Sequence, residues 1–193
     1  MDLNQFTQSA VAALRDAQKL AIEYQNQSIE PEHMLVALCQ QQDGLIPQLL
    51  TKMEVDPGTF QAAAAEKVEA LSRVTGSGRD PDKVYVSAAF DQILNAADAQ
   101  KASMKDEYIT VEHIFIGMLQ RPNRALKELF KQFGITQEKF MAALSGVRGN
   151  QRVTTDNPES TYNALEKYGL DLVAMARQNK LDPVIGRDDE IRN

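Results

Sequence analysis

The chain has 193 residues, of which 43% are hydrophobic and 25% are charged, as is usual for globular domains that live in water. Its formal net charge of −6 argues against nucleic acid as a partner, because nucleic acid requires a basic face. The sequence has no apolar run long enough to cross a bilayer, no signal-peptide pattern and a single cysteine, so we expect no membrane partner, no disulfide framework and a cytoplasmic location.

The first part of the chain predicts four helices. Apolar side chains recur at helical spacing in the first of them, and proline falls at the first position of the second and fourth, where its missing N–H does no harm. Asp43 can cap the third helix by accepting from its free N–H groups, and Asp56 can cap the fourth in the same way. The expected helices span residues 4–24, 31–41, 44–53 and 57–73.

A cluster of Gly, Ser, Asp and Pro at residues 75–82 predicts a loop, and four more helices follow it. Each has a side chain that can act as its N-cap, namely Ser87, Thr110, Asn123 and Thr136. The expected helices span residues 88–104, 111–120, 124–133 and 137–146.

The two sets of helices are copies of one unit. SIEPEHMLVALCQ at residues 28–40 returns as YITVEHIFIGMLQ at 108–120, a shift of 80 positions that also relates Leu14 to Leu94. The period is far too long for a solenoid repeat. We therefore expect an all-α fold of about eight helices, built from a pseudo-twofold duplicated four-helix repeat. Residues 1–148 would form this domain, with repeat one at about 4–74 and repeat two at about 84–148.

The amino-acid composition of the sequence changes after the second repeat. Polar residues dominate, and residues 149–163 predict a flexible linker. Helical periodicity returns afterwards, and the sequence stops inside an apparent helix start rich in acidic residues. We therefore expect 164–193 to be the truncated start of another domain, and the chain to be part of a longer protein.

The two histidines raise the hypothesis of a metal site. His33 and His113 stand at equivalent places one turn into equivalent helices, and each follows a glutamate. No HExxH motif, further cysteine or third histidine joins them, so each copy would offer half a site. A structural role fits better, in which Glu32 and Glu112 complement the free N–H groups of the helix start and the imidazole nitrogens find partners. We expect no metal.

Signatures of catalysis are also missing. The sequence has no GxSxG and no GxxxxGK[ST], the loop that cradles nucleotide phosphates. We interpret Cys39, among apolar residues on a predicted helix, as a small buried hydrophobic residue rather than a nucleophile. We therefore expect this chain to be a binding or scaffolding module without enzymatic activity or cofactor.

The first helix of each repeat carries an apolar stripe that would by default be core. The stripes contain Leu3, Phe6 and Val11 in one copy and Phe90, Ile93 and Leu94 in the other. Where two copies meet, a groove between their first helices can stay partly open, and an apolar groove with a polar rim can hold peptide segments. The candidate substrate-binding residues are Thr7, Leu94, Asp106 and Glu112. A scaffold whose seam is sealed, with the polar candidates as caps or solvated surface, is the alternative.

The doubled Glu-His helix starts, the linker and the string ALEKYGLDL…ARQNKLDPVIGRDDEI together resemble the Clp/Hsp100 family over essentially the whole chain. The duplicated part looks like the amino-terminal domain of that family. LDPVIGRDDEI is the most specific piece and looks like the entrance to the first AAA+ ATPase module. ALEKYG favours the disaggregase branch of the family over the branches whose unfoldases serve a protease.

The resemblance implies a homohexameric chaperone that uses ATP and Mg²⁺ to thread polypeptides out of aggregates together with the DnaK system. The amino-terminal domain would capture unfolded or aggregated polypeptides by weak binding to their exposed hydrophobic segments, and the fragment alone would be a monomer. In the intact parent protein, the backbone of Val184, Ile185 and Gly186 would contact the nucleotide, with Arg187 beside them. The alternative implied by the family is an adaptor- or substrate-docking domain of a protease-serving unfoldase.

Overall fold

The computed structural model describes residues 2–74 and 84–162. Packing divides the chain into two compact units, Met1–Pro158 and Glu159–Asn193. The described residues form helices joined by loops, with isolated β-bridges in place of a sheet, which confirms the predicted all-α fold class. In chain order the elements are η1 (Leu3–Gln5), α1 (Gln8–Glu23), α2 (Pro31–Gln40), α3 (Leu45–Lys52), α4 (Pro57–Glu69), α5 (Ala88–Ser103), α6 (Val111–Gln120), α7 (Arg124–Phe133) and α8 (Gln137–Arg148).

The duplication seen in the sequence is present in the backbone. The bounds of α5 and α6 follow those of α1 and α2 after a shift of 80 positions. Backbone conformations repeat at the same shift, since Gln25 and Lys105 both have positive φ, at 57° and 59°. The left-handed turn after α3, at Glu54 with φ 63°, recurs after α7 at Gly134 with φ 67°. The fold is therefore a pseudo-twofold pair of four-helix repeats.

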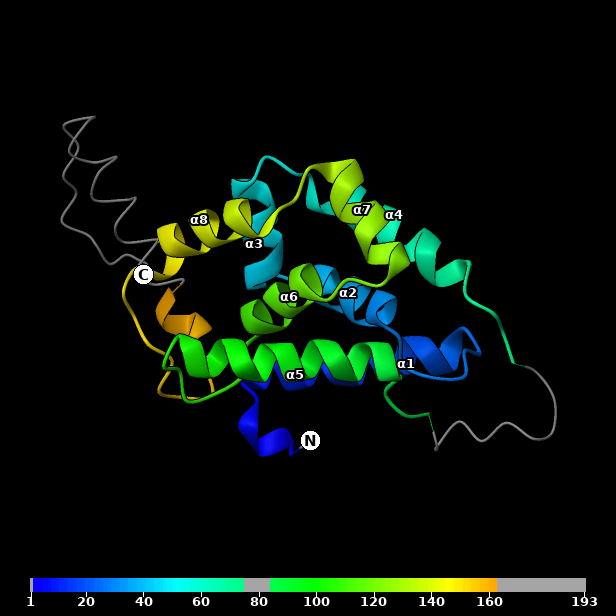
Figure 1. Cartoon of the computed structure of the whole chain (residues 1–193), viewed down its shortest axis with the longest axis horizontal. Helices are drawn as coiled ribbons and strands as arrows, with labels where there is room; N and C mark the ends of the chain where they lie inside the picture. Colours follow the sequence, from blue (N-terminus) through cyan, green and yellow to red (C-terminus); the bar gives the residue numbers. More distant parts are fainter. Residues whose placement is uncertain (1, 75–83, 163–193) are drawn as a thin grey trace. The chain divides into compact units, whose positions relative to one another are not determined.

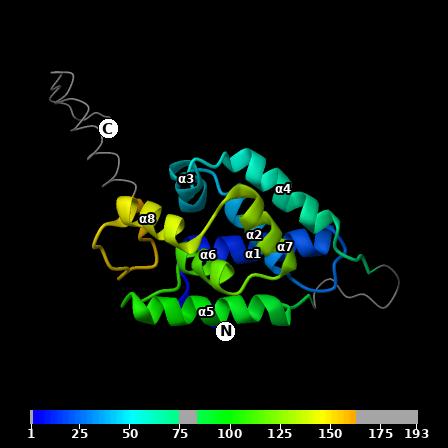
Figure 2. The same cartoon turned by 45° about the horizontal axis from the view of Figure 1, so that its top comes forward.

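The core lies around α2 and α6. Nearly every residue of these two helices is buried, because other helices cover them on several sides. Figure 1 shows α2 and α6 between a level formed by α1 and α5 and a level formed by α3, α4, α7 and α8. Figure 2, turned by 45°, separates α5 from α1, which overlap in the first view. α1 packs on α2, and α5 packs on α6.

The two repeats are joined by crossed backbone bridges. Phe6 forms a parallel bridge with Ile109, and Ile29 forms one with Val86. Val86 is the counterpart of Phe6 and Ile109 the counterpart of Ile29, so the leading segment of each repeat pairs with the other repeat. The hydrogen bonds run from Thr7 N to Ile109 O (3.0 Å), Ile109 N to Gln5 O (2.8 Å), Ile29 N to Tyr85 O (2.9 Å) and Ser87 N to Ile29 O (3.0 Å).

Three details of the predicted helices are wrong. The first helix begins at Gln8 and not at residue 4, because Leu3–Gln5 form the short 3-10 helix η1 and Phe6 is extended and pairs with Ile109. Asp43 does not cap α3, because it adopts a left-handed conformation with φ 55° and Gly44 takes the cap position without a side-chain bond. The fourth helix ends at Glu69 and not near Arg73, because the chain leaves the helix and Arg73 forms an antiparallel bridge with Asn26.

The compact unit extends past the predicted domain boundary at 148. The backbone N–H of Glu107 donates to Val153 O (2.8 Å), and that of Gln8 donates to Asp156 O (2.8 Å). The side chain of Val153 is buried. The first part of the segment predicted as a flexible linker thus lies against the domain, because its carbonyl groups pair with the start of α1 and the loop before α6.

Candidate functional site

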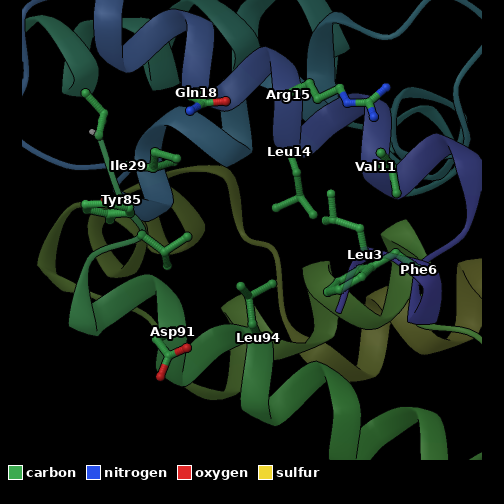
Figure 3. Close-up of a pocket in the computed structure, with 12 residues that line it drawn as sticks. Leu3, Phe6, Val11, Leu14, Arg15, Gln18, Ile29, Tyr85, Asp91 and Leu94 are labelled. Atoms are coloured by element: carbon green, nitrogen blue, oxygen red, sulfur yellow. The ribbon is translucent and has the colours of Figure 1, made fainter. Parts of the chain in front are cut away.

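An apolar groove of about 290 Å³ opens between α1, α5, η1 and the segment 84–86. Figure 3 shows Leu14 on α1 and Leu94 on α5 pointing toward each other across it. These two leucines occupy equivalent positions in the two repeats, so the groove lies where the first helices of both copies meet. Its lining consists of Leu3, Phe6, Val11, Leu14, Arg15, Gln18, Ile29, Val84, Tyr85, Val86, Asp91 and Leu94.

The crossed bridges supply part of the groove lining. They hold the backbone of residues 84–86 beside Ile29, and η1 beside the segment before α6. The bridged residues Phe6, Ile29 and Val86 line the groove together with the facing side chains of α1 and α5. Both repeats therefore contribute helix residues and bridged segments to the groove.

The large hydrophobic side chains that are exposed among the described residues all belong to this groove. They are Leu3 (47% exposed), Tyr85 (70%) and Val86 (39%), and all three line this groove. Single exposed apolar residues are common on protein surfaces, but several of them lining one groove are typical of an interaction site.

The rim of the groove is polar. Figure 3 shows Arg15 and Gln18 on the α1 side and Asp91 on the α5 side. An apolar lining with a few polar groups at its edge is the usual composition of a peptide- or ligand-binding groove. Among the described residues that line the groove there is no histidine, cysteine or serine.

Of the residues predicted to bind substrate, Leu94 lines the groove and three polar ones do not. Thr7 is buried, and its side chain caps α1 by accepting from Ala10 N. Asp106 and Glu112 are buried and meet elsewhere, where Arg148 donates to both. Leu3, Phe6 and Val11 line the groove as the apolar stripe suggested, whereas Phe90 and Ile93 lie in the core.

Asp106 is held as a carboxylate by the groups around it. Burial alone would raise the pKa of this carboxyl, but hydrogen bonds from His113, Arg148 and the backbone N–H of Val153 outweigh burial and lower the pKa to about 2. The Val153 bond, at 2.9 Å, also ties the segment after α8 to the body. Asp106 thus organises the end of the domain rather than facing the groove.

The two histidines have the structural role expected of them. Nδ1 of His33 accepts from Glu30 N (2.9 Å), so its Nε2 carries the proton and donates to Asn26 Oδ1 (2.7 Å). His113 repeats the arrangement with Thr110 N (2.9 Å) and Asp106 Oδ2 (2.8 Å). Both ring nitrogens of each histidine are therefore engaged.

Cys39 is buried, and burial raises the pKa of its thiol to about 12, so the reactive thiolate is not available at neutral pH. Among the described residues, no helix is both long and apolar enough to cross a membrane. The predicted nucleotide-contacting residues Val184, Ile185, Gly186 and Arg187 lie outside the described residues.

The segment Val84 to Val86 was not predicted as part of the site. Its apolar side chains follow a loop and show no helical spacing, so periodicity gives them no partner. A signal was nevertheless present, because Val86 stands at the position equivalent to Phe6 in the first repeat. Arg15, Gln18 and Asp91 were missed because charged and amide residues on a helix usually face solvent.

Several known proteins are similar to this chain in sequence or in fold. The model of the Clp repeat (R) N-terminal domain matches residues 5–133. Chaperone protein ClpB of Bacillus cereus is 43% identical over 192 residues, which are 100% of this chain and 22% of that protein. The Hsp104 N-terminal domain from Candida albicans matches with a TM-score of 0.68 and 24% identity, covering 79% of this chain and 97% of that one. A complex of the ClpV N-domain with a VipB peptide matches with a TM-score of 0.60 and 18% identity, covering 74% and 86%.

Proposed function

Because the chain belongs to the Clp repeat N-terminal domain family, we propose that its groove captures exposed hydrophobic segments of unfolded or aggregated polypeptides for an ATP-driven disaggregase. The chain is similar along its whole length to the amino-terminal region of ClpB chaperones, and it spans 22% of the length of ClpB from Bacillus cereus. The activity, substrates and partners of the longer protein are therefore proposed as well.

One observation carries the proposal. The exposed large hydrophobic side chains of the described residues, Leu3, Tyr85 and Val86, all line the groove between α1 and α5. Covering this surface with an apolar segment of another polypeptide would remove it from water, which is worth about 25 cal/mol per Å². The ClpV N-domain, which has the same fold, was solved with a VipB peptide, and this supports peptide binding as a use of the fold.

Capture by this groove should be weak and tolerant of sequence. The groove is small, and association costs several kcal/mol before any gain from burial appears as affinity. Weak binding suits the function, because a tightly held segment would resist being pulled away. A groove lined by leucine, valine and aromatic side chains also selects for apolar character rather than for one sequence.

The other functions of the proposed disaggregase belong to the longer protein. There we expect a homohexamer that binds ATP and Mg²⁺, threads the captured polypeptide and works with the DnaK system. Val184 to Arg187 would contribute backbone to the adenine site. An adaptor-docking domain of a ClpC- or ClpA-type unfoldase is the alternative, and the 43% identity to ClpB over the whole chain favours the disaggregase.

For the predicted site residues we propose two kinds of role. Leu94 would contact the bound segment directly, since it lines the groove. Thr7 would act by position, because its backbone N–H donates to Ile109 O in one of the bridges that supply part of the groove lining. Asp106 and Glu112 would act at a distance from the groove, because their carboxylates bind Arg148 at the end of α8.

Nuclear magnetic resonance titration of the isotopically labelled chain with an unfolded, apolar-rich polypeptide tests the proposal. We expect shifts to cluster at groove residues such as Leu14, Val86 and Leu94, with a dissociation constant between about 1 µM and 1 mM. Tyr85→Ser should weaken binding by roughly tenfold, because it removes the most exposed aromatic surface of the groove.

Tyr24→Ser is the matched control, since Tyr24 packs under Arg73 and does not line the groove. It should leave affinity unchanged when both variants are shown to be folded. A flat titration of the folded chain would contradict capture and favour the scaffold or adaptor-docking role.

A further inference from the structure

The two ends of the groove carry opposite charges. In Figure 3 the guanidinium of Arg15 lies toward the end formed by Val11 and Phe6, whereas the carboxylate of Asp91 lies toward Tyr85 at the other end. Arg15, Phe6 and Val11 also line an adjoining pocket that reaches Asp156. The side chain of Asp156 accepts from Gln8 Nε2 (3.2 Å), so it has a partner of its own.

These charges break the symmetry of the duplicated fold. At the shift of 80 positions, the counterpart of Arg15 is Asn95 and the counterpart of Asp91 is Val11. A groove with equivalent walls would accept a bound segment equally well in either chain direction. With a cation only on the α1 wall and an anion only on the α5 wall, the two directions are no longer equivalent.

Neither charge is used inside the described part of the domain. The ion pairs there join other residues, and Arg15 and Asp91 take part in none of them. Both side chains are exposed. They are therefore available to a partner, and each would form a surface ion pair whose strength depends on ionic strength.

We propose that the groove binds an apolar polypeptide segment with an acidic residue at one flank and a basic residue at the other, and that it holds this segment in one chain direction. Arg15 pairs with the acidic flank and Asp91 with the basic flank, while the apolar side chains between them fill the groove. The inference rests on the proposed function, because it assumes that the groove takes a polypeptide. It adds a charge pattern and a direction to a site otherwise selective only for apolar character.

Three labelled peptides with one palindromic apolar core test this inference by fluorescence anisotropy with the whole chain. One peptide has two Glu before the core and two Lys after it, the second exchanges these flanks, and the third has Ser flanks. The two charged peptides have the same composition, so apolar burial and net charge are matched. We expect about a threefold to tenfold difference in affinity between them, as two exposed ion pairs would give, and the difference should shrink at 1 M salt.

The double variant R15E/D91K should reverse which charged peptide binds better, because it exchanges the charges at the two ends of the groove. The control D16K/K19E exchanges charges on α1 at residues that do not line the groove, and it should keep the wild-type preference. Equal affinity of the two charged peptides for the wild-type chain would overturn the inference. If the Ser peptide still binds in that case, the proposed capture of apolar segments is not contradicted. If none of the three peptides binds, both proposals fail. Reversal in the control would also overturn the inference, since the general field of the protein would then set the preference.

Discussion

At the scale of single residues, the two repeats differ at the partner of the buried histidine. His33 pairs with neutral Asn26, and its counterpart His113 pairs with Asp106. A buried carboxylate without a cation would cost several kcal/mol. Repeat two supplies that cation as Arg148, at the position where repeat one has buried Val68. The two repeats thus differ at two positions that depend on each other, and Asp106 also accepts from Val153 N in repeat two.

The buried His33 should make the domain sensitive to mild acid. Burial lowers the pKa of its imidazole from 6.5 to about 4, against the opposing effect of Glu30. Between these two values the unfolded chain binds a proton that the folded chain does not, so the free energy of unfolding falls as pH drops through this window. The loss should reach up to about 3 kcal/mol near pH 4, as measured by urea unfolding at several pH values.

His33→Gln isolates this effect. The variant should be less stable at pH 7, because one buried hydrogen bond is lost, and its stability should change less between pH 6.5 and 4. Glu32 also titrates with a raised pKa caused by burial, but it does so in both proteins and cancels in the difference. If the wild-type chain and the variant lose stability in parallel over this window, His33 is not the group responsible.

At the scale of helices, one close approach sets the packing of repeat two. Gly117 on α6 lies so near α5 that an added Cβ would sit 2.6 Å from Ile93 O, a backbone atom that cannot move alone. Gly117→Ala should therefore destabilise the domain by about 1–3 kcal/mol, although alanine favours helix by about 1 kcal/mol. Chemical denaturation monitored by circular dichroism measures the change.

Gly146→Ala is the matched control for that prediction. Gly146 lies within α8, and a Cβ there would meet nothing within 4 Å. The substitution should leave stability unchanged or raise it by up to about 1 kcal/mol through helix propensity. A stability loss at Gly146 as large as that at Gly117 would contradict the prediction, because the loss at Gly117 could then not be assigned to the close approach of α6 to α5.

The positions of the helices could be predicted from the local sequence, whereas some helix ends depend on contacts between residues far apart in the sequence. Ser87, Thr110 and Asn123 cap helices, as Ser, Thr and Asn before an apolar period suggest. The early end of α4 could not be predicted locally, because Arg73 pairs with Asn26 in another part of the repeat. The left-handed Asp43 likewise shows that a favourable cap residue is not used when the turn before the helix requires another geometry.

At the scale of the whole molecule, the location of the groove was predictable and its composition was not. The shift of 80 positions placed the first helices of both repeats opposite each other, and Leu94 was named on that basis. The remaining lining comes from the crossed bridges, which bring Tyr85 and Val86 beside Ile29. Such pairing between segments far apart in sequence leaves no periodic signal, since neither segment is itself a strand or a helix.

The crossed bridges also predict that neither repeat folds alone. Each leading segment finds its backbone partners on the other repeat, and α2 and α6 bury surface against helices of both. A fragment of residues 1–83 or 84–158 would expose that apolar surface, and we expect neither to show a cooperative thermal transition by circular dichroism. Mixing the two fragments should restore the transition and, with it, peptide binding, because the groove takes its walls from α1 and α5 together. Cooperative unfolding of either fragment by itself would mean that the bridges join two independent units, and the groove would then be only the contact between them.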